Sequence, residues 1–175
     1  MFKALIAAGL LAGPAWAGPI GPMVSSDLNG DGKVERFSLI DSDGSVDLVI
    51  ENTGGGVVIA EDVAWMGGIG QQPELDVAAN GSVRLTSMNE AIGRNRWHLT
   101  LTIAYRRNAY MVAGVTYAWY DTLDLDAGGS CDLNLLTGKG ILDVKSGRRE
   151  VRTSLAPMPV TDWHDDVAMP PPGCD

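Results

Sequence analysis

Alternation of apolar and polar residues between Arg96 and Arg106 restricts the possible folds of this chain more than any other feature. A period of two over this length is typical of a β-strand with one buried and one solvated face. Residues 107–109 then predict a turn, and residues 110–120 return as the partner strand. We expect these two strands at the centre of a sheet. The apolar positions are Trp97, Leu99, Leu101, Ile103 and Tyr105.

Turn-forming pairs place further strands on both sides of this hairpin. Asp43-Gly44 separates the runs 36–40 and 45–51, and Asn80-Gly81 separates 74–78 from 82–88. Both pairs are typical of two-residue hairpin turns, and Asn-Gly favours type I′. The sequence therefore predicts an all-β domain, either an antiparallel sandwich or a curled, barrel-like sheet of about eight to ten strands. The remaining expected strands are 57–61, 131–136, 141–144 and 148–154.

The C-terminal segment has a different composition from the rest of the chain. Prolines at 157, 159 and 170–172 oppose regular strands, so we expect residues 156–175 to run extended over the surface. The chain has two cysteines, Cys131 and Cys174. In an oxidising compartment such a pair predicts one disulfide, which would tie this tail to the β domain at 18–155.

The N-terminus has the pattern of a secretory signal peptide. Lys3 precedes a short apolar run from Ala4 to Leu11, and Ala15-Trp16-Ala17 is typical of a cleavage site. The apolar run is shorter than the ~20 residues that a membrane-spanning helix needs. We therefore expect cleavage after Ala17 and a soluble periplasmic or secreted protein, without a membrane span.

The charge of the chain limits its partners. Asp and Glu number 22 against 13 Lys and Arg, which gives a net charge of −9. Binding to nucleic acid depends on basic residues that contact phosphates, so this balance argues against nucleic acid and against anionic membranes. An acidic surface is compatible with binding cations, and it also serves solubility alone.

Residues 27–35 carry the clearest functional pattern in the chain. Asp27, Asn29, Asp31 and Glu35 place side-chain oxygens at loop positions 1, 3, 5 and 9, with glycine at position 6. Lys33 would add its backbone carbonyl. Oxygen ligands in this order are typical of loops that wrap Ca²⁺. A turn rich in Asn, Asp and Gly that binds no metal is the alternative.

The loop resembles a known motif that is not the EF-hand. An EF-hand has a bidentate glutamate at position 12, where this chain has Ser38, and strand rather than helix is expected to follow. The D-x-N-x-D-G-x-x-[D/E] pattern resembles the loops of FG-GAP and VCBS-type repeats. That resemblance implies a structural Ca²⁺ between two strands. Position 9 is Glu rather than the usual Asp, and the single copy excludes a propeller of several blades.

A second resemblance covers about a third of the chain. Residues 96–101 form an aromatic strand, residues 110–114 a Y-x-x-x-G strand, and residues 131–139 contain the turn N-L-L-T-G-K. Together with the expected export signal and the acidic loop, they resemble a group of uncharacterised bacterial envelope proteins. The resemblance implies export and a β fold, and it implies no reaction.

Sequence patterns for catalysis are weak. The chain has two histidines, His98 and His164, and it contains neither G-x-S-x-G nor H-E-x-x-H. A triad requires a nucleophile, a base and an orienting acid within reach of one another. Arg94, Arg96 and His98 lie on one strand segment and form a possible ligand surface. We expect no enzyme, and a hydrolase acting on the cell envelope or on a polysaccharide is the alternative.

The sequence thus predicts an exported, Ca²⁺-stabilised β domain with a binding or structural role. Its partner would be an envelope protein or a glycan, and we expect a monomer. A periplasmic inhibitor of a secreted enzyme is a further alternative. Aromatic residues concentrate on the central hairpin, where they either form a binding platform or fill the core.

Overall fold

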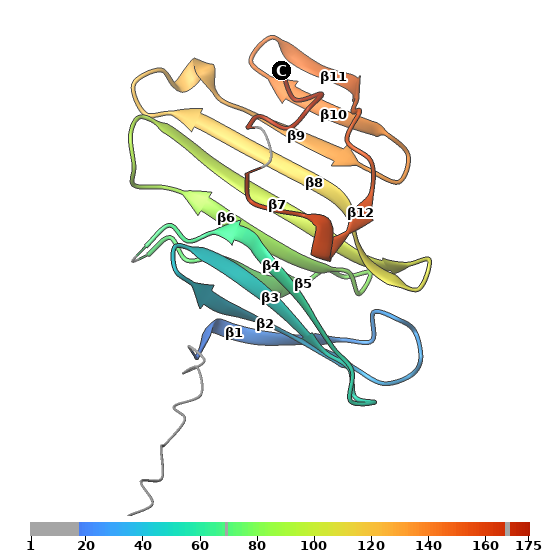
Figure 1. Ribbon diagram of the computed structural model, residues 1–175. Helices are drawn as coiled ribbons and strands as arrows, with labels where there is room; N and C mark the ends of the chain where they lie inside the picture. Colours follow the sequence, from blue (N-terminus) through green and yellow to red (C-terminus); the bar gives the residue numbers. More distant parts are fainter. Residues whose placement is uncertain (1–17, 69, 167–168) are drawn as a thin grey trace, which may run out of the picture.

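The computed structural model describes residues 18–68, 70–166 and 169–175 (Figure 1). The predicted signal peptide at 1–17 lies outside these residues. The described chain forms an all-β fold with twelve strands in two open antiparallel sheets, which confirms the predicted fold class. Among the described residues, no helix has the length and apolar character needed to cross a bilayer.

The smaller sheet has four strands in sequence order, joined by hairpin turns. Its order β1-β2-β3-β4 follows the chain, so each strand pairs with the next. The strands are β1 (Pro19–Ser26), β2 (Glu35–Ser42), β3 (Ser45–Glu51) and β4 (Val57–Trp65).

The larger sheet has eight strands, and seven of them follow the order β11-β10-β9-β8-β7-β6-β5. The two-residue strand β12 (Met158–Pro159) pairs with β8 at Val112 and Met111. The other strands are β5 (Glu74–Val77), β6 (Val83–Asn89), β7 (Asn95–Arg106), β8 (Ala109–Asp121), β9 (Gly129–Asn134), β10 (Lys139–Val144) and β11 (Gly147–Arg152). Short 3₁₀ turns, η1 (Leu125–Ala127) and η2 (Val160–Asp162), complete the elements.

The structure confirms the predicted central hairpin. β7 pairs with β8 along its whole length, and a two-residue turn at Arg107 and Asn108 joins them. Both turn residues have positive φ, 54° and 61°, as a type I′ turn requires. Leu99, Leu101 and Ile103 are buried, so the apolar face of the alternating strand lies in the core.

The two predicted turn pairs have different outcomes. Asp43 and Gly44 form the expected two-residue turn between β2 and β3, with φ of 52° and 104°. The type I′ prediction at Asn80-Gly81 was wrong, because Gly81 has positive φ and Asn80 does not. Gly81 N–H donates to the Ala78 carbonyl at 2.8 Å, so the hairpin has a three-residue loop with glycine in the left-handed position.

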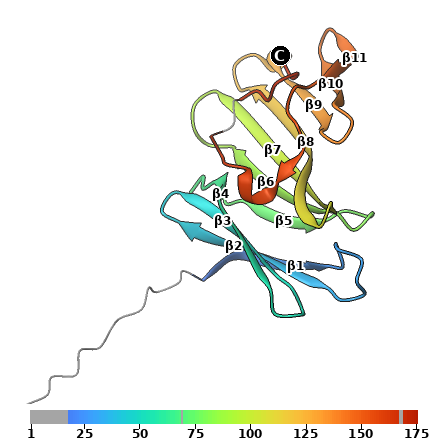
Figure 2. The same ribbon diagram turned by 45° about the vertical axis from the view of Figure 1, so that its right-hand side comes forward.

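The two sheets face each other over only part of their area. Strands of the small sheet contact β5 and β6, at one side of the large sheet (Figure 2). Apolar residues from both sheets fill the space between them, including Phe37, Leu48 and Ile50 from one sheet and Leu85 and Leu101 from the other. The inner face of the large sheet therefore extends beyond its four-stranded partner.

The C-terminal tail covers this extension, which corrects the expectation of a segment lying only over the surface. Val160 and Trp163 belong to the hydrophobic core, with exposures of 1% and 0%. Asp165 N–H donates to the Asp62 carbonyl of β4 at 2.9 Å, so the tail also contacts the small sheet. A proline-rich segment can serve this role because its ladder with β8 is only two residues long and buried side chains provide much of its contact with the core.

A disulfide between Cys131 of β9 and Cys174 holds the end of the tail, as the sequence predicts. The two Cα atoms lie 5.6 Å apart, and both cysteines are buried. Gly173 approaches β11 so closely that a Cβ there would lie 2.6 Å from the Arg152 carbonyl oxygen. Its φ of +97° also favours glycine. Both the close contact with β11 and the backbone conformation therefore require glycine at position 173.

Loss of the disulfide should destabilise the protein. Replacing both cysteines by serine, Cys131→Ser with Cys174→Ser, should lower the free energy of unfolding by about 4 kcal/mol, because the bond closes a long loop in the unfolded chain. Chemical denaturation with and without a reducing agent measures this effect. The double variant should not respond to the reductant, and equal midpoints for reduced and oxidised wild type would contradict the prediction.

Trp163 tests the structural role of the tail. Trp163→Ala removes a fully buried indole and should cost about 3–5 kcal/mol of unfolding free energy. His164→Ala is the matched control, since the neighbouring imidazole is exposed and its loss should change stability by less than about 0.5 kcal/mol. Equal denaturation midpoints for the two variants would show that the tail does not pack as described.

Candidate metal centre and adjoining pocket

The acidic loop at 27–35 joins β1 to β2 and closes through its own side chains. Asp31 N–H donates to Asn29 Oδ1 at 2.8 Å, and Lys33 N–H donates to Asp31 Oδ1 at 2.8 Å. Gly32 N–H donates to Asp27 Oδ2 at 3.0 Å across the loop. Gly30 and Gly32 adopt φ of 74° and 83°, which lets the backbone turn twice within a few residues.

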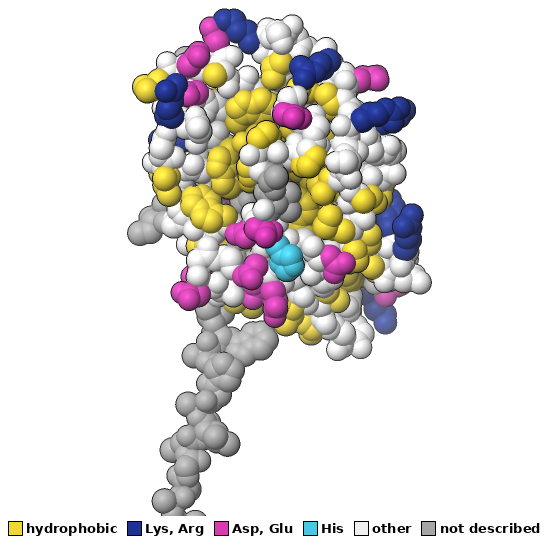
Figure 3. Space-filling view, turned by 45° about the horizontal axis from the view of Figure 1, so that its top comes forward, with side chains coloured by type: hydrophobic (Ala, Val, Ile, Leu, Met, Phe, Trp, Pro, Cys, Tyr) yellow, Lys and Arg dark blue, Asp and Glu magenta, His cyan; other side chains and the backbone are white. Residues whose placement is uncertain are grey.

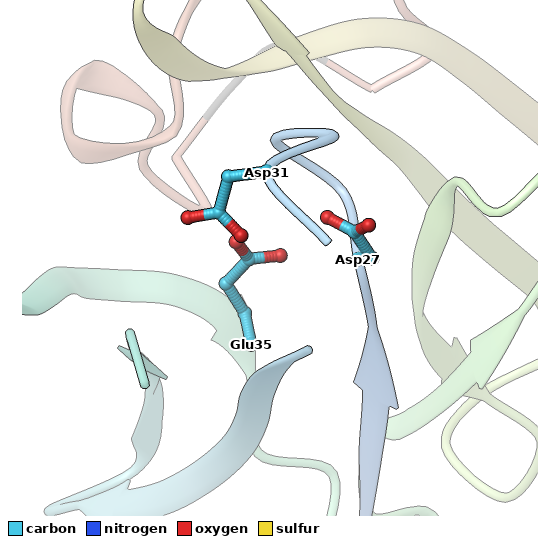
Figure 4. Close-up of side chains that lie close together, drawn as sticks. All are labelled: Asp27, Asp31 and Glu35. Atoms are coloured by element: carbon cyan, nitrogen blue, oxygen red, sulfur yellow. The ribbon is translucent and has the colours of Figure 1, made fainter. Parts of the chain in front are cut away.

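Three carboxylates meet where this loop enters β2 (Figure 4). Oxygens of Asp27, Asp31 and Glu35 all lie within 4.8 Å of one another. Calcium ligands lie ~2.4 Å from the ion, so oxygens on opposite sides of it are up to ~4.8 Å apart. The spread of the three groups therefore fits a shared Ca²⁺, and carboxylate oxygens are the donors that this ion prefers.

Glu35 is the member of this cluster with the most unusual environment. It is the first residue of β2 and only 1% exposed, whereas Asp27 and Asp31 are exposed. Its Oε2 accepts the Leu28 N–H at 2.7 Å. A buried carboxylate is unfavourable unless hydrogen bonds or a cation compensate its charge. The burial of Glu35 therefore favours binding of a positive ion at this loop.

Three of the five predicted ligands, Asp27, Asp31 and Glu35, converge through their carboxylates. Asn29 and Lys33 lie in the same loop, where they make hydrogen bonds that shape it. Asn29 Oδ1 accepts from Asp31 N–H, and its Nδ2 lies 3.3 Å from Asp31 Oδ2. Lys33 uses its backbone N–H, and its carbonyl remains a predicted ligand. Metal binding by the set is still a prediction.

A pocket of about 540 Å³ adjoins the acidic loop. Four segments that are distant in sequence form its wall: the β1–β2 loop, the turn between β3 and β4, the β7–β8 hairpin, and η2 of the tail. Asp31 belongs both to the carboxylate cluster and to this wall. The principal side chains around the pocket are Asp31, Lys33, Asn52, Tyr105, Asn108 and Tyr110.

Tyr110 connects the floor of the pocket to the carboxylates. Its ring packs edge-on against Phe37, with centroids 6.1 Å apart, and its hydroxyl donates to Asn52 Oδ1 at 2.5 Å. Burial, and next the negative charge of Glu35, raise the pKa of Tyr110 to about 12. The sequence predicts Tyr110 on the central hairpin but not beside the acidic loop, because no local pattern links the two segments.

The predicted ligand surface at Arg94, Arg96 and His98 lies at the opposite end of the β7–β8 hairpin. Arg94 Nε pairs with Asp121 Oδ2 at 2.6 Å, and the hydrogen bond from Arg94 lowers the pKa of Asp121. His98 Nε2 lies 2.5 Å from Glu90 Oε1. Arg94 and His98 are therefore paired within the protein.

Arg96 has a different position from its two neighbours. It lines a pocket of about 330 Å³ together with Trp119 and Tyr120. Tyr120 donates its hydroxyl proton to Glu90 Oε2 at 2.6 Å, and this bond is the first cause of the lowered pKa of Glu90. Arg94 and His98 thus belong to two separate ion pairs, whereas Arg96 lines the pocket with a buried Nη1 that has no hydrogen-bond partner among the described residues.

A second acidic region lies where the tail crosses β4. Figure 3 shows acidic side chains around a histidine on this face, while lysine and arginine lie toward its margins. Burial, and next the charge of Asp62, raise the pKa of Asp165. Asp62 itself accepts a hydrogen bond from Ser45 Oγ and has φ of 52°. Hydrogen bonds of the fold thus account for the close approach of these acids.

Comparison of the chain with known protein families, with curated proteins and with solved structures found no match. Residue geometry therefore carries the functional interpretation. The likeness of residues 27–35 to FG-GAP and VCBS loops remains a resemblance.

Tyr110 should give the protein a specific sensitivity to alkali. Its pKa in the folded state lies above the ordinary value of 10, so its contribution to stability is complete below pH 10 and is lost as the pH rises toward 12. Tyr110→Phe should therefore lose less stability than wild type across this range, measured by denaturation at a series of pH values. Parallel pH profiles for the two proteins would contradict the prediction.

Proposed function

We propose that the protein is an exported β domain that binds Ca²⁺ in the loop 27–35 and acts by binding a partner rather than by catalysis. The observation that carries the metal proposal is the convergence of Asp27, Asp31 and Glu35 within 4.8 Å, with Glu35 buried. Without a cation, these three negative charges repel one another at short range. A bound Ca²⁺ would remove that repulsion.

The position of the loop makes a structural role for the ion physically reasonable. It joins the first two strands of the small sheet, and Glu35 pairs with Ser26 in the β1–β2 ladder. Ser26 Oγ in turn donates to the Gly81 carbonyl at 2.7 Å, which connects this end of β1 to the large sheet. Metal binding and folding are coupled when only the folded chain assembles the ligands. Ca²⁺ would thus stabilise the edge where the two sheets meet.

Two features support export. Residues 1–17 have the pattern of a cleavable leader, and the buried Cys131–Cys174 disulfide is of the kind that persists in oxidising compartments. These features favour the periplasm or the extracellular space. The expected partner is an envelope protein or a glycan, and the protein would act as a monomer.

A hydrolase is the second candidate, because His98 Nε2 lies 2.5 Å from Glu90 Oε1, as a base lies beside its orienting acid. Binding is preferred because, within the described residues, the His98 ring makes no hydrogen bond to a Ser, Thr or Cys that could serve as a nucleophile. The 540 Å³ pocket beside the acidic loop lies within the size range of small-molecule sites, ~300–1,000 Å³, and it offers a place for a ligand.

Calcium should stabilise the metal-free protein. At a concentration 100 times the dissociation constant, Ca²⁺ should add about 2.7 kcal/mol to the free energy of unfolding, because the unfolded chain lacks the assembled site. Thermal denaturation after chelation and after readdition of Ca²⁺ measures the shift in Tm, and calorimetric titration measures uptake directly. Absence of both signals at millimolar Ca²⁺ would refute the metal proposal.

Two variants with the same charge change make this test specific. Glu35→Gln should abolish most of the Ca²⁺-dependent shift in Tm, because it removes the buried ligand. Glu61→Gln removes an exposed carboxylate on β4 and should leave the shift unchanged. An equal loss in both variants would indicate a general effect of charge rather than a site.

A further inference from the structure

The pocket beside the acidic loop has side chains whose hydrogen-bonding capacity the fold does not use. Asn52 is already occupied, because its Oδ1 accepts from Tyr110 and its Nδ2 lies 3.3 Å from the Gly56 carbonyl. The Tyr105 hydroxyl, the Asn108 amide and the Lys33 ammonium make no side-chain hydrogen bond to any residue in the described ranges. These three groups are free to contact a ligand.

The β7–β8 hairpin positions two of these residues, Tyr105 and Asn108. Tyr105 pairs with Tyr110 across the β7–β8 ladder, and the two rings lie 5.1 Å apart at 62°. Asn108 occupies the second position of the type I′ turn that follows, with φ of 61°. The half-buried ring and the exposed amide thus border the same pocket from one hairpin.

The chemistry of the wall selects a class of ligand. An amide both donates and accepts hydrogen bonds, as a sugar hydroxyl does, and a tyrosine adds an apolar ring with a polar end. Among the principal lining side chains, Lys33 is the cation and Asp31 the anion, so their charges cancel. An uncharged, hydroxyl-rich molecule with apolar C–H faces matches this wall.

We propose that this pocket binds an uncharged pyranose oligosaccharide, with a sugar ring against Tyr105 and hydroxyl groups hydrogen-bonded to the Asn108 amide. The volume of about 540 Å³ is within the range of small-molecule sites. This inference rests on the binding role proposed above and gives it a ligand class. Asp31 links the two sites, since it belongs to both the carboxylate cluster and the pocket wall. Ca²⁺ that holds Asp31 in place should therefore strengthen sugar binding.

Titration with defined trisaccharides tests the proposal. Maltotriose, cellotriose, mannotriose and chitotriose, with trigalacturonate as the anionic comparison, would be added at millimolar concentration to the ¹⁵N-labelled protein in Ca²⁺. We expect at least one neutral trisaccharide to shift the backbone resonances of Tyr105 and Asn108, and trigalacturonate to bind more weakly. The proposal is overturned if no neutral trisaccharide shifts these resonances or if trigalacturonate binds best.

Variants in the hairpin assign the binding to the pocket. Asn108→Gly removes the amide and keeps a residue suited to positive φ, and Tyr105→Ala removes the ring. Each should weaken binding roughly tenfold, the effect of about 1.4 kcal/mol. Arg107→Gly is the matched control, because Arg107 shares the turn and the positive φ but does not line the pocket. Unchanged affinity in Asn108→Gly, or equal weakening in Arg107→Gly, would overturn the assignment.

Sugar binding and Ca²⁺ binding can be measured separately. Calcium uptake is measured by calorimetry in the absence of sugar, and sugar binding is measured with and without a chelator. Normal Ca²⁺ uptake without sugar binding refutes the oligosaccharide alone. Wild-type sugar binding that a chelator leaves unchanged, together with normal Ca²⁺ uptake, refutes the link through Asp31 and supports the pocket.

Discussion

The unequal size of the two sheets is the constraint on which the rest of this structure depends. Four strands cannot cover the inner face of an eight-stranded sheet, and apolar side chains on that face must be removed from water. The tail supplies the missing cover with Val160, Trp163 and Cys174, all of them buried. The tail forms no long ladder, so few backbone hydrogen bonds hold it in place. The disulfide from Cys174 to Cys131 attaches its end to the large sheet.

The same tail also shapes the pocket. β12 pairs with β8 beyond the end of β9, and this pairing carries η2 toward β4 at the end of the sandwich where the acidic loop lies. One side of the pocket therefore belongs to the segment that completes the core. Stability and ligand access are linked here, because release of the tail would remove part of the wall as well as the cover.

The sequence predicts the parts of this molecule that are governed by local rules. The alternating residues of β7, the Asp43-Gly44 turn and the cysteine pair each have a local or chemical cause that is visible without the fold. The loop at Asn80 does not form the predicted type I′ turn. Asn80 Oδ1 instead accepts a hydrogen bond from Ser82 N–H at 3.1 Å, and only Gly81 takes the left-handed conformation. The burial of Trp163 could not be predicted, since it results from the mismatch in sheet size.

The candidate site shows the same division. The oxygen spacing from Asp27 to Glu35 is a local property, so the gathering of acidic side chains in this loop can be predicted from the sequence. The contact of this loop with Tyr110 is a property of the fold, because it depends on the packing of β2 against the end of the β7–β8 hairpin. Glu35 is buried for this reason, whereas Asp27 and Asp31 stay exposed. A positive ion at the loop would therefore have two effects. It would hold the loop closed by binding the exposed carboxylates of Asp27 and Asp31, and it would neutralise the buried charge of Glu35 next to the pocket.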